Sequence, residues 1–353
     1  MLFTGGIPAE SVEDVFRLLA GTVGSRAMSY PDGELNERGM WIGALKDAVW
    51  ERCDQLERIP SALPEGTPEA EMFPSYRVKD GVTDVRLEGL LPYARSAVES
   101  YEIFARLRGE GVIDPQMRLQ MAYPGALDAI SLYFPRVEDW SVMLRAWTNA
   151  LADEHRRILE AVPPSKLVVQ IDYCLETSII DGVLPETAHW VTPDMTGKAA
   201  LERYTSNDYL APHFAGLPDE VLAGYHICLG TFPKWPRVPI DDLSMPVAVV
   251  NALAANSGRR IDFFHLPVMA DVDERFFAPL ERLDVGDAAI YLGVECDDGD
   301  EAMQRRIADA RKFLPTFGVA HYCGYSWKAD VLPQLLSTLR AGADGQVAAM
   351  RAG

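Results

Sequence analysis

Short hydrophobic runs alternate along the chain with longer stretches in which apolar residues recur every three to four positions. The short runs are typical of buried strands and the longer stretches of amphipathic helices, so their alternation predicts parallel strands covered by helices. Strands are expected at 19–24, 118–123, 166–172, 223–228, 260–266, 288–294 and 317–323. Helices are expected over 35–56, 88–108, 140–162, 243–256, 301–314 and 331–341.

This order of elements predicts an α/β protein, a (β/α)8 TIM barrel with long inserted loops, although one strand is missing from the pattern. The eighth strand is expected in the weakly patterned region 60–90, in FPSYRV or in VTDVRL. Pro-rich and polar stretches predict insertions at about 57–90 and 174–220. A chain of 353 residues then forms a single barrel domain, 1–353.

Composition narrows the class of protein. The chain is 48% hydrophobic and 24% charged, which is typical of a globular protein with a large core. No apolar run approaches the roughly 20 residues that span a bilayer, and the first residues lack the pattern of a signal peptide, so we expect a cytoplasmic protein without membrane contact. The net charge of −19 argues against nucleic acid as a partner. Five cysteines, an odd number, fit a reducing compartment better than a disulfide framework.

Two of the expected strands end in cysteine, with glycine one or two positions later. His226 and Cys228 lie in GYHICLG, and Cys323 lies in GVAHYCGYSW. Imidazole and thiolate are ligands that zinc favours, and the carboxyl ends of barrel strands meet at one mouth. The alternative is that the cysteines are small core residues and the histidine a buried polar group with its own partner.

These strand-end motifs resemble the cobalamin-independent methionine synthases, within the uroporphyrinogen decarboxylase–methionine synthase superfamily. VVQIDYCLETS is similar to that family's QIDEPAL strand, GYHICLG to its His-x-Cys zinc strand, and GVAHYCGYSW to its NPDCGLKTR strand. The segment from YLGVECDD to Cys323 also follows the family's order of strand, acidic loop, helix and cysteine. The resemblance covers about residues 20–330 as a set of motifs, and only the catalytic half of the two-barrel synthases.

The resemblance implies a zinc ion held by His226, Cys228 and Cys323. The family keeps a glutamate near the position of His265, so His265 is expected as the fourth ligand, or as a hydrogen-bonding neighbour of a three-ligand metal. Asp262 is the fallback ligand. The implied function is a zinc-dependent methyl- or alkyltransferase in which a thiol acceptor reacts as a zinc-bound thiolate.

Catalytic roles are expected for Asp172, which would orient the acceptor, and for Glu295, which would assist the leaving group. The expected substrate-binding residues lie at or near strand ends: Arg26, Asp32, Glu34, Tyr123, Tyr173 and His321. Asp32 and Glu34 belong to SYPDGE, which is alternatively a tight turn, as is Tyr123-Pro124-Gly125. The acidic run from Glu295 is alternatively a solvated loop.

The sequence also departs from the family's motifs. Tyr173 and Cys174 replace the Glu and Pro of QIDEP, so the acceptor is expected to be a thiol other than homocysteine. Glu295-Cys296 stands where the family has a catalytic histidine, which leaves the donor open between a folate-type and another methyl donor. The partners are thus a small-molecule thiol and a methyl or alkyl donor, and the chain itself can form a homo-oligomer. The alternatives are a zinc-dependent lyase, an epoxide-to-thiol alkyltransferase or a non-catalytic barrel that binds zinc or a thiol.

Overall fold

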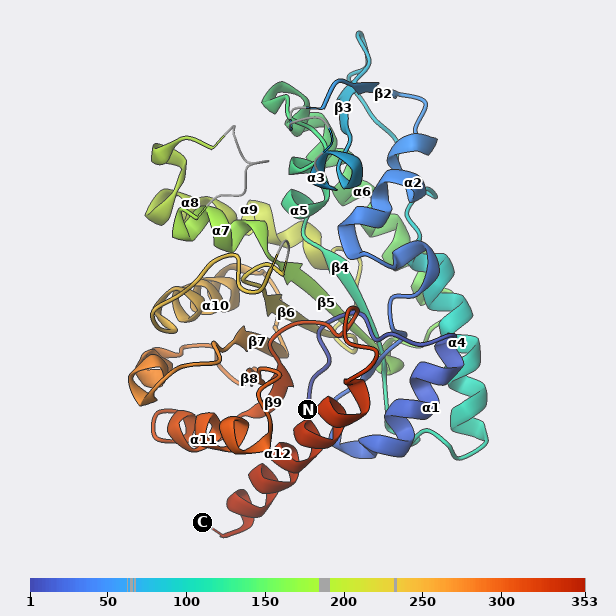
Figure 1. Ribbon diagram of the computed structural model, residues 1–353. Helices are drawn as coiled ribbons and strands as arrows, with labels where there is room; N and C mark the ends of the chain where they lie inside the picture. Colours follow the sequence, from blue (N-terminus) through green and yellow to red (C-terminus); the bar gives the residue numbers. More distant parts are fainter. Residues whose placement is uncertain (62, 64–65, 67, 184–190, 232–233, 353) are drawn as a thin grey trace.

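The computed structural model describes residues 1–353 except 62, 64–65, 67, 184–190, 232–233 and 353. Its centre is a curled, seven-stranded parallel sheet with helices on its outer face (Figure 1). The strand order is β1-β4-β5-β6-β7-β8-β9. These strands are β1 (Tyr30–Pro31), β4 (Leu119–Pro124), β5 (Leu167–Tyr173), β6 (Leu222–Ile227), β7 (Phe263–Pro267), β8 (Ala289–Glu295) and β9 (Gly318–His321).

Helices connect successive strands and pack on the sheet, α4 against β4, α10 against β7, α11 against β8 and α12 against β9. Parallel strands require this arrangement, because the connection between two of them must run back to the end of the sheet at which the first strand began. The α-helices are α1 (Val12–Thr22), α2 (Leu45–Ala48), α3 (Pro68–Met72), α4 (Tyr93–Gly109), α5 (Ala126–Ser131), α6 (Trp140–Leu159), α7 (Leu175–Asp181), α8 (Gly197–Tyr204), α9 (Asn207–Leu210), α10 (Ser244–Asn256), α11 (Asp300–Arg311) and α12 (Leu332–Ala352).

Six of the expected strands are confirmed, as β4 to β9, but the strand expected at 19–24 is wrong. Those residues end helix α1, where Ser11 caps the first turn by accepting a hydrogen bond from the Asp14 amide. Val15, Phe16 and Leu19 are buried on one side of this helix, which is helical and not strand periodicity. The first strand of the sheet is instead β1, only two residues long.

The region 60–90 contributes no strand to the curled sheet among its described residues. FPSYRV does contain a strand, β3 (Ser75–Val78), but β3 pairs antiparallel with β2 (Leu56–Ile59) in a separate two-stranded sheet. The long helix expected at 35–56 is also wrong, because positive φ angles at Asn36, Met40 and Trp41 divide it into short turns. The expected insertion 174–220 is helical in α7, α8 and α9, and its residues 184–190 lie outside the described residues.

The N-terminal segment contacts both edges of the curled sheet. Leu2 forms a parallel bridge with Ala320 of β9, and its amide donates to the Val319 carbonyl at 3.1 Å. On its other side, the Met28 amide, just before β1, donates to the Met1 carbonyl at 2.9 Å. Met1 and Leu2 therefore lie between β9 and the segment that leads into β1, as the position of the N terminus in Figure 1 also shows.

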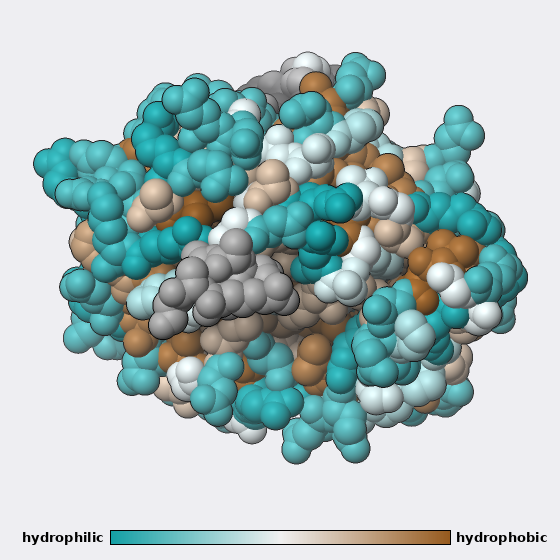
Figure 2. Space-filling view, turned by 90° about the horizontal axis from the view of Figure 1, so that it is seen from below, coloured by the Kyte–Doolittle hydropathy of each residue, from teal (hydrophilic) through white to brown (hydrophobic). Residues whose placement is uncertain are grey.

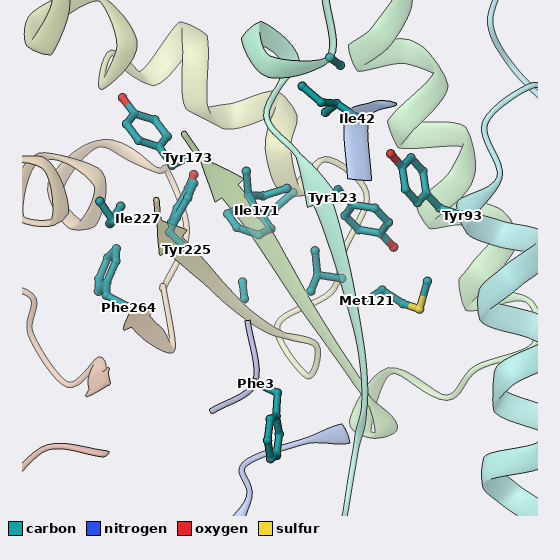
Figure 3. Close-up of a cluster of buried hydrophobic side chains, with 14 of the residues drawn as sticks. Phe3, Ile42, Tyr93, Met121, Tyr123, Ile171, Tyr173, Tyr225, Ile227 and Phe264 are labelled. Atoms are coloured by element: carbon teal, nitrogen blue, oxygen red, sulfur yellow. The ribbon is translucent and has the colours of Figure 1, made fainter. Parts of the chain in front are cut away.

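Alternation along the strands separates two buried environments. Side chains such as Ile171, Tyr173, Tyr225 and Ile227 form the hydrophobic cluster of Figure 3, which belongs to the large core shared with the helices. The opposite face encloses a smaller apolar cluster of Leu2, Val168, Phe263 and Ala320. The sheet therefore has an apolar plug inside its curl, near the amino ends of the strands.

Buried amides lie above this plug. Gln120 Nε2 donates to the Phe3 carbonyl at 2.6 Å, and Gln170 Nε2 donates to the Thr4 carbonyl and to Asp172 Oδ1, both at 2.8 Å. Both glutamine amides thus find partners, which limits the free-energy cost of placing them inside the sheet. The interior changes from apolar to hydrogen-bonded toward the carboxyl ends of the strands.

None of the helices in the described part of the chain is long and apolar enough to cross a membrane. Figure 2 shows the face seen from below, where hydrophilic residues surround smaller, separate patches of hydrophobic ones. Scattered patches of this kind are normal for a globular protein surface.

Candidate metal centre

Polar side chains occupy equivalent positions on three neighbouring strands. Asp172 of β5 pairs in register with His226 of β6, which pairs with His265 of β7. Gln170 and Asp172 are two residues apart on β5, so both side chains face the inside of the curl. Parallel pairing therefore sets an acid and two imidazoles side by side near the carboxyl end of the sheet.

His226, Cys228 and Cys323 form a group whose ligand atoms all lie within 4.8 Å of one another. Cys323 Sγ lies 3.6 Å from His226 Nε2 and 3.9 Å from Cys228 Sγ. The Gly230 amide donates to Cys228 Sγ at 3.3 Å. One imidazole nitrogen and two sulfurs at these separations suit zinc, which binds such donors at about 2.0–2.3 Å, so the residues fit the ion that the motifs imply.

A chain of hydrogen bonds orients His226. His265 Nε2 lies 3.1 Å from the His321 carbonyl, which can only accept, so Nε2 of His265 carries a proton. Burial lowers the pKa of His265 well below its usual value, so its Nδ1 is an acceptor. His226 Nδ1, 2.8 Å away, must then donate, which leaves the lone pair of His226 Nε2 directed toward the two sulfurs. The structure thus brings His265 next to His226 and not into the three-residue group.

Gly293 makes room for this arrangement. A Cβ at this position would lie 3.1 Å from His265 Nε2 and 2.8 Å from the Tyr322 Cα. Any larger residue would push His265 away from the His321 carbonyl. The glycine in YLGVE is therefore required by the imidazole on the neighbouring strand.

Replacement of His265 by alanine is expected to weaken zinc binding 10- to 100-fold without abolishing it. The reason is that His226 loses the partner that fixes its tautomer and ring orientation. Competition with a chromogenic chelator measures the affinity. His265→Asn, whose amide oxygen can accept from His226, should recover part of the loss, while His321→Ala should change affinity less than His265→Ala. Complete loss of zinc in His265→Ala would identify His265 as a direct ligand.

His321 belongs to a second polar group with Glu295 and Asp297. Its Nε2 lies 3.1 Å from Asp297 Oδ1 and 3.5 Å from Glu295 Oε2, while its Nδ1 lies 2.7 Å from the Cys323 carbonyl. Lys328 and Tyr322 also bond Asp297, so protein cations and donors already occupy this carboxylate. His321 hydrogen-bonds to the backbone of Cys323, and the sulfur-containing group is the better candidate for a metal site.

A third cysteine lies beside the centre. Cys174 follows β5 directly, is 5% exposed, and lies beside Cys228 in the strand register. The neighbouring Cys228 thiol and burial raise the pKa of Cys174. The Cys174 thiol lowers the pKa of Cys228, but the Cys323 thiol and burial outweigh it, so the pKa of Cys228 is raised too. Both thiols therefore stay protonated at neutral pH unless a metal ion binds them.

A cavity of about 160 Å³ adjoins the centre. Its lining includes the three candidate ligands, Cys174 and the carboxyl groups of Glu34, Asp128 and Asp172. Its outer lining includes Met40, 44% exposed, and Trp327, 73% exposed, which form an apolar rim. Cavities with apolar walls and a few convergent polar groups are typical of small-molecule sites.

Burial is the main cause of the raised pKa values of the cavity's carboxyl groups. It raises the pKa of Glu34 to about 7, with Arg38 opposing and Asp32 adding to the shift. It also raises the pKa of Asp172 and of Asp128 well above the ordinary value, and the nearby Glu34 raises that of Asp172 further. Carboxyl groups crowded in this way either keep protons or bind a cation.

Glu34→Gln is expected to stabilise the protein above pH 7 but not below pH 4.5. Between these values native Glu34 keeps a proton that the unfolded chain has released, so wild-type stability falls as pH rises through this window. The shift corresponds to about 3 kcal/mol, and water reaching the cavity reduces the expected gain to roughly 2 kcal/mol. Urea unfolding at pH 4 and pH 8 measures it, with Glu37→Gln, an exposed neighbour, as control. An equal effect at both pH values would contradict the shift.

The other residues expected to bind substrate lie away from the cavity lining. Asp32 is buried against Arg38 and accepts from Ser100 Oγ at 3.0 Å, so it holds the loop of Glu34. Tyr173 donates to the Tyr204 carbonyl at 3.1 Å, and Tyr123 packs against Tyr93 in the outer core. Glu295 and His321 lie behind Cys323 and are not among the described lining residues.

Arg26 lies before β1, where its side chain bonds Asp344 of α12. It lines a separate hollow of about 730 Å³ with Met1, Tyr291 and Gln346. The described residues around this hollow include neither histidine nor cysteine. The larger hollow is therefore not a candidate for the metal centre.

Asp128 and Cys174 line the cavity but were not among the expected site residues. Asp128 lies in α5 just after β4, and its carboxylate accepts from the Cys174 and Leu175 amides at 3.2 and 2.9 Å. Its position soon after a strand was a usable signal, as it was for Asp172. Cys174 stood out as a departure from the family motif, but its contact with Cys228 depends on the strand register.

Comparisons with known proteins agree with this geometry at the level of the fold. A B12-independent methionine synthase from Shewanella sp. W3-18-1, solved in complex with selenomethionine, superposes with a TM-score of 0.64 at 16% identity. The match covers 100% of this chain and 99% of that one. A putative vitamin-B12 independent methionine synthase from Listeria monocytogenes gives 0.57 at 14% identity, covering 95% and 86%. No family model and no curated protein sequence matches the chain. The chain therefore has a methionine synthase-like fold.

Proposed function

We propose that this chain is a zinc-dependent methyl- or alkyltransferase that activates a thiol acceptor, in the manner of a methionine synthase. The observation that carries the proposal is the group of His226, Cys228 and Cys323 at the edge of a cavity lined by carboxyl groups. Three protein donors leave a further coordination position for a substrate, which is typical of catalytic and not of structural zinc sites. This feature favours an enzyme over a non-catalytic metal-binding barrel.

In this proposal His226 Nε2 and the sulfurs of Cys228 and Cys323 hold the ion, and His265 fixes the tautomer of His226. Bound zinc would lower the pKa of an incoming thiol so that a thiolate is available at neutral pH. Asp172 and Glu34, which line the same cavity, orient the acceptor. Burial raises the pKa of Glu295, which lies beside His321 and supports it next to Cys323. The substrates are a small-molecule thiol and a donor, folate-type or another methyl donor, whose apolar part would meet Met40 and Trp327.

We also propose that the curled sheet is a closed (β/α)8 barrel forming one domain over 1–353. The bridge of Leu2 to Ala320 and the hydrogen bond from Met28 to Met1 support the N-terminal segment as the eighth strand. Closure would remove the two edges of the sheet and direct all strand ends to one mouth.

We also propose that the protein is cytoplasmic and that several copies of the chain assemble.

Metal analysis followed by a transfer assay tests the function. Protein purified without chelator should contain about one zinc per chain, and thiols should raise its melting temperature. X-ray absorption should show one additional sulfur neighbour of zinc when the acceptor thiol is present. Methyl transfer to a thiol from methyltetrahydrofolate or a simpler methyl donor should require the metal. Stoichiometric zinc with no added sulfur from any thiol would favour a structural metal and overturn the proposal.

A further inference from the structure

We propose that Cys174 and Cys228 form a reversible disulfide, which withdraws the Cys228 sulfur from the metal centre. The pairing itself depends only on the positions of the two cysteines. Its consequence for metal binding rests on the proposed function. The site is therefore a redox modification site built into the end of two neighbouring strands.

The strand register brings the two cysteines to equivalent positions. Tyr173 of β5 pairs with Ile227 of β6, and each is followed directly by a cysteine. The Cys228 amide donates to the Tyr173 carbonyl at 3.0 Å, so the pairing extends to the cysteines. Neighbouring strands lie about 4.8 Å apart, within the roughly 4.4–6.8 Å between Cα atoms that a disulfide requires. A bond between the sulfurs therefore needs no large movement of the backbone.

Thr177 holds the two cysteine backbones together. Its Oγ1 lies 2.5 Å from the Cys174 carbonyl and 2.6 Å from the Cys228 carbonyl. The hydroxyl therefore spans the ends of both strands. Both cysteines also line the same cavity.

Cys228 is shared between two alternatives. On one side Cys174 follows the neighbouring strand in register with it, and on the other its sulfur lies 3.9 Å from Cys323 Sγ. Cys323 follows β9, which is separated from β6 by β7 and β8, so this second pair reaches across the inside of the curl. Zinc can join the two sulfurs that lie 3.9 Å apart across the curl, whereas the strand register brings the backbones of Cys174 and Cys228 within the Cα separation that a disulfide requires.

The reaction requires an oxidant, and a hydroperoxide such as hydrogen peroxide is sufficient. The Cys228 sulfur attacks a peroxide oxygen and becomes a sulfenic acid, and the other oxygen leaves as water. The Cys174 sulfur then attacks the sulfenic sulfur, and its proton leaves with the hydroxide as a second water. Two thiols are oxidised and one peroxide is reduced to two waters. Cys174 lines the cavity, so the oxidant reaches the pair through the substrate entrance.

Peptide mapping of the full-length, metal-free protein tests the pairing. After stoichiometric hydrogen peroxide and alkylation, mass spectrometry should find Cys174 joined to Cys228, with Cys53, Cys296 and Cys323 alkylated. Cys174→Ser should abolish the cross-link, and Cys53→Ser, a buried cysteine away from the cavity, should keep it. A bond between Cys228 and Cys323, or alkylation of both Cys174 and Cys228, would overturn the proposal.

Zinc binding by the oxidised protein tests the consequence. Oxidised wild type should bind zinc at least about tenfold more weakly, and a dithiol reductant should restore binding. Treated with two or more equivalents of peroxide, Cys174→Ser should not recover, because without its neighbour the Cys228 sulfenic acid reacts with a second peroxide to give the sulfinic acid. A mapped disulfide with unchanged zinc affinity would contradict the proposal that the disulfide and zinc compete for the Cys228 sulfur. A reduced protein that binds no zinc would overturn the proposed function, while the mapped disulfide would stand.

Discussion

Replacement of Cys228 by serine is expected to remove nearly all stoichiometric zinc and, with it, transfer activity. Cys228 is one of only three side chains in the candidate group, and serine is a poor substitute for a thiolate toward zinc. Zinc binds to structural sites with four ligands with a free energy of about 10–16 kcal/mol. The loss of one donor of three should therefore weaken zinc binding at least about 100-fold. Elemental analysis after dialysis against a weak chelator measures the remaining metal.

Cys53→Ser is the matched control for this experiment. Cys53 is also buried, with Sγ near the Arg86 carbonyl, but it lies outside the lining of the cavity. It should cost some stability and keep the zinc. If Cys228→Ser retained one zinc per chain, the metal would belong elsewhere, and Glu295, Asp297 and His321 would be the next group to mutate.

The sequence predicted the strands whose signal is a continuous apolar run. β4 and β5 are buried at every position, which is the pattern of a strand covered on both faces. The run at 19–24 is also short and apolar but forms the end of α1 and the turn after it, because a short apolar run does not by itself distinguish strand from helix. β1 has only two residues and the N-terminal contact involves Met1 and Leu2, so neither is long enough to leave a periodic signal.

The sequence predicted those residues of the candidate centre that stand at the end of a recognisable strand. Asp172, His226, Cys228 and Cys323 all follow this rule and all line the cavity. The relation between His265 and His226 was left open, because it depends on which ring nitrogens face each other. The clustering of Glu34 and Asp128 around Asp172 depends on loops and on α5, whose packing no local pattern in the sequence specifies.

This clustering changes the expectation for the acceptor. The sequence suggested that a thiol with an ammonium group would lack a carboxylate partner, because Tyr173 and Cys174 replace the Glu and Pro of the family motif. The structure places Glu34 and Asp128 in the lining of the same cavity as Asp172. All three carboxyl groups have raised pKa values, with burial as the main cause, and a bound cation would offset that cost. The reason for excluding an ammonium group is thereby removed.

Asp172→Asn is accordingly expected to weaken the binding of a thiol that carries an ammonium group roughly 10- to 100-fold. A hydrogen bond to a charged group contributes about 1.5–3 kcal/mol, and asparagine keeps the shape but removes the charge. An amine-free thiol of similar length should bind the variant and the wild type alike, and it serves as the control ligand. Calorimetry in buffers of different ionisation enthalpy should detect proton release when wild type binds the ammonium thiol, because Asp172 or Glu34 must ionise to pair with it. Tighter binding of the amine-free thiol by wild type would instead return the acceptor to the class that the sequence suggested, and equal weakening of both thiols would make Asp172 a residue that shapes the cavity.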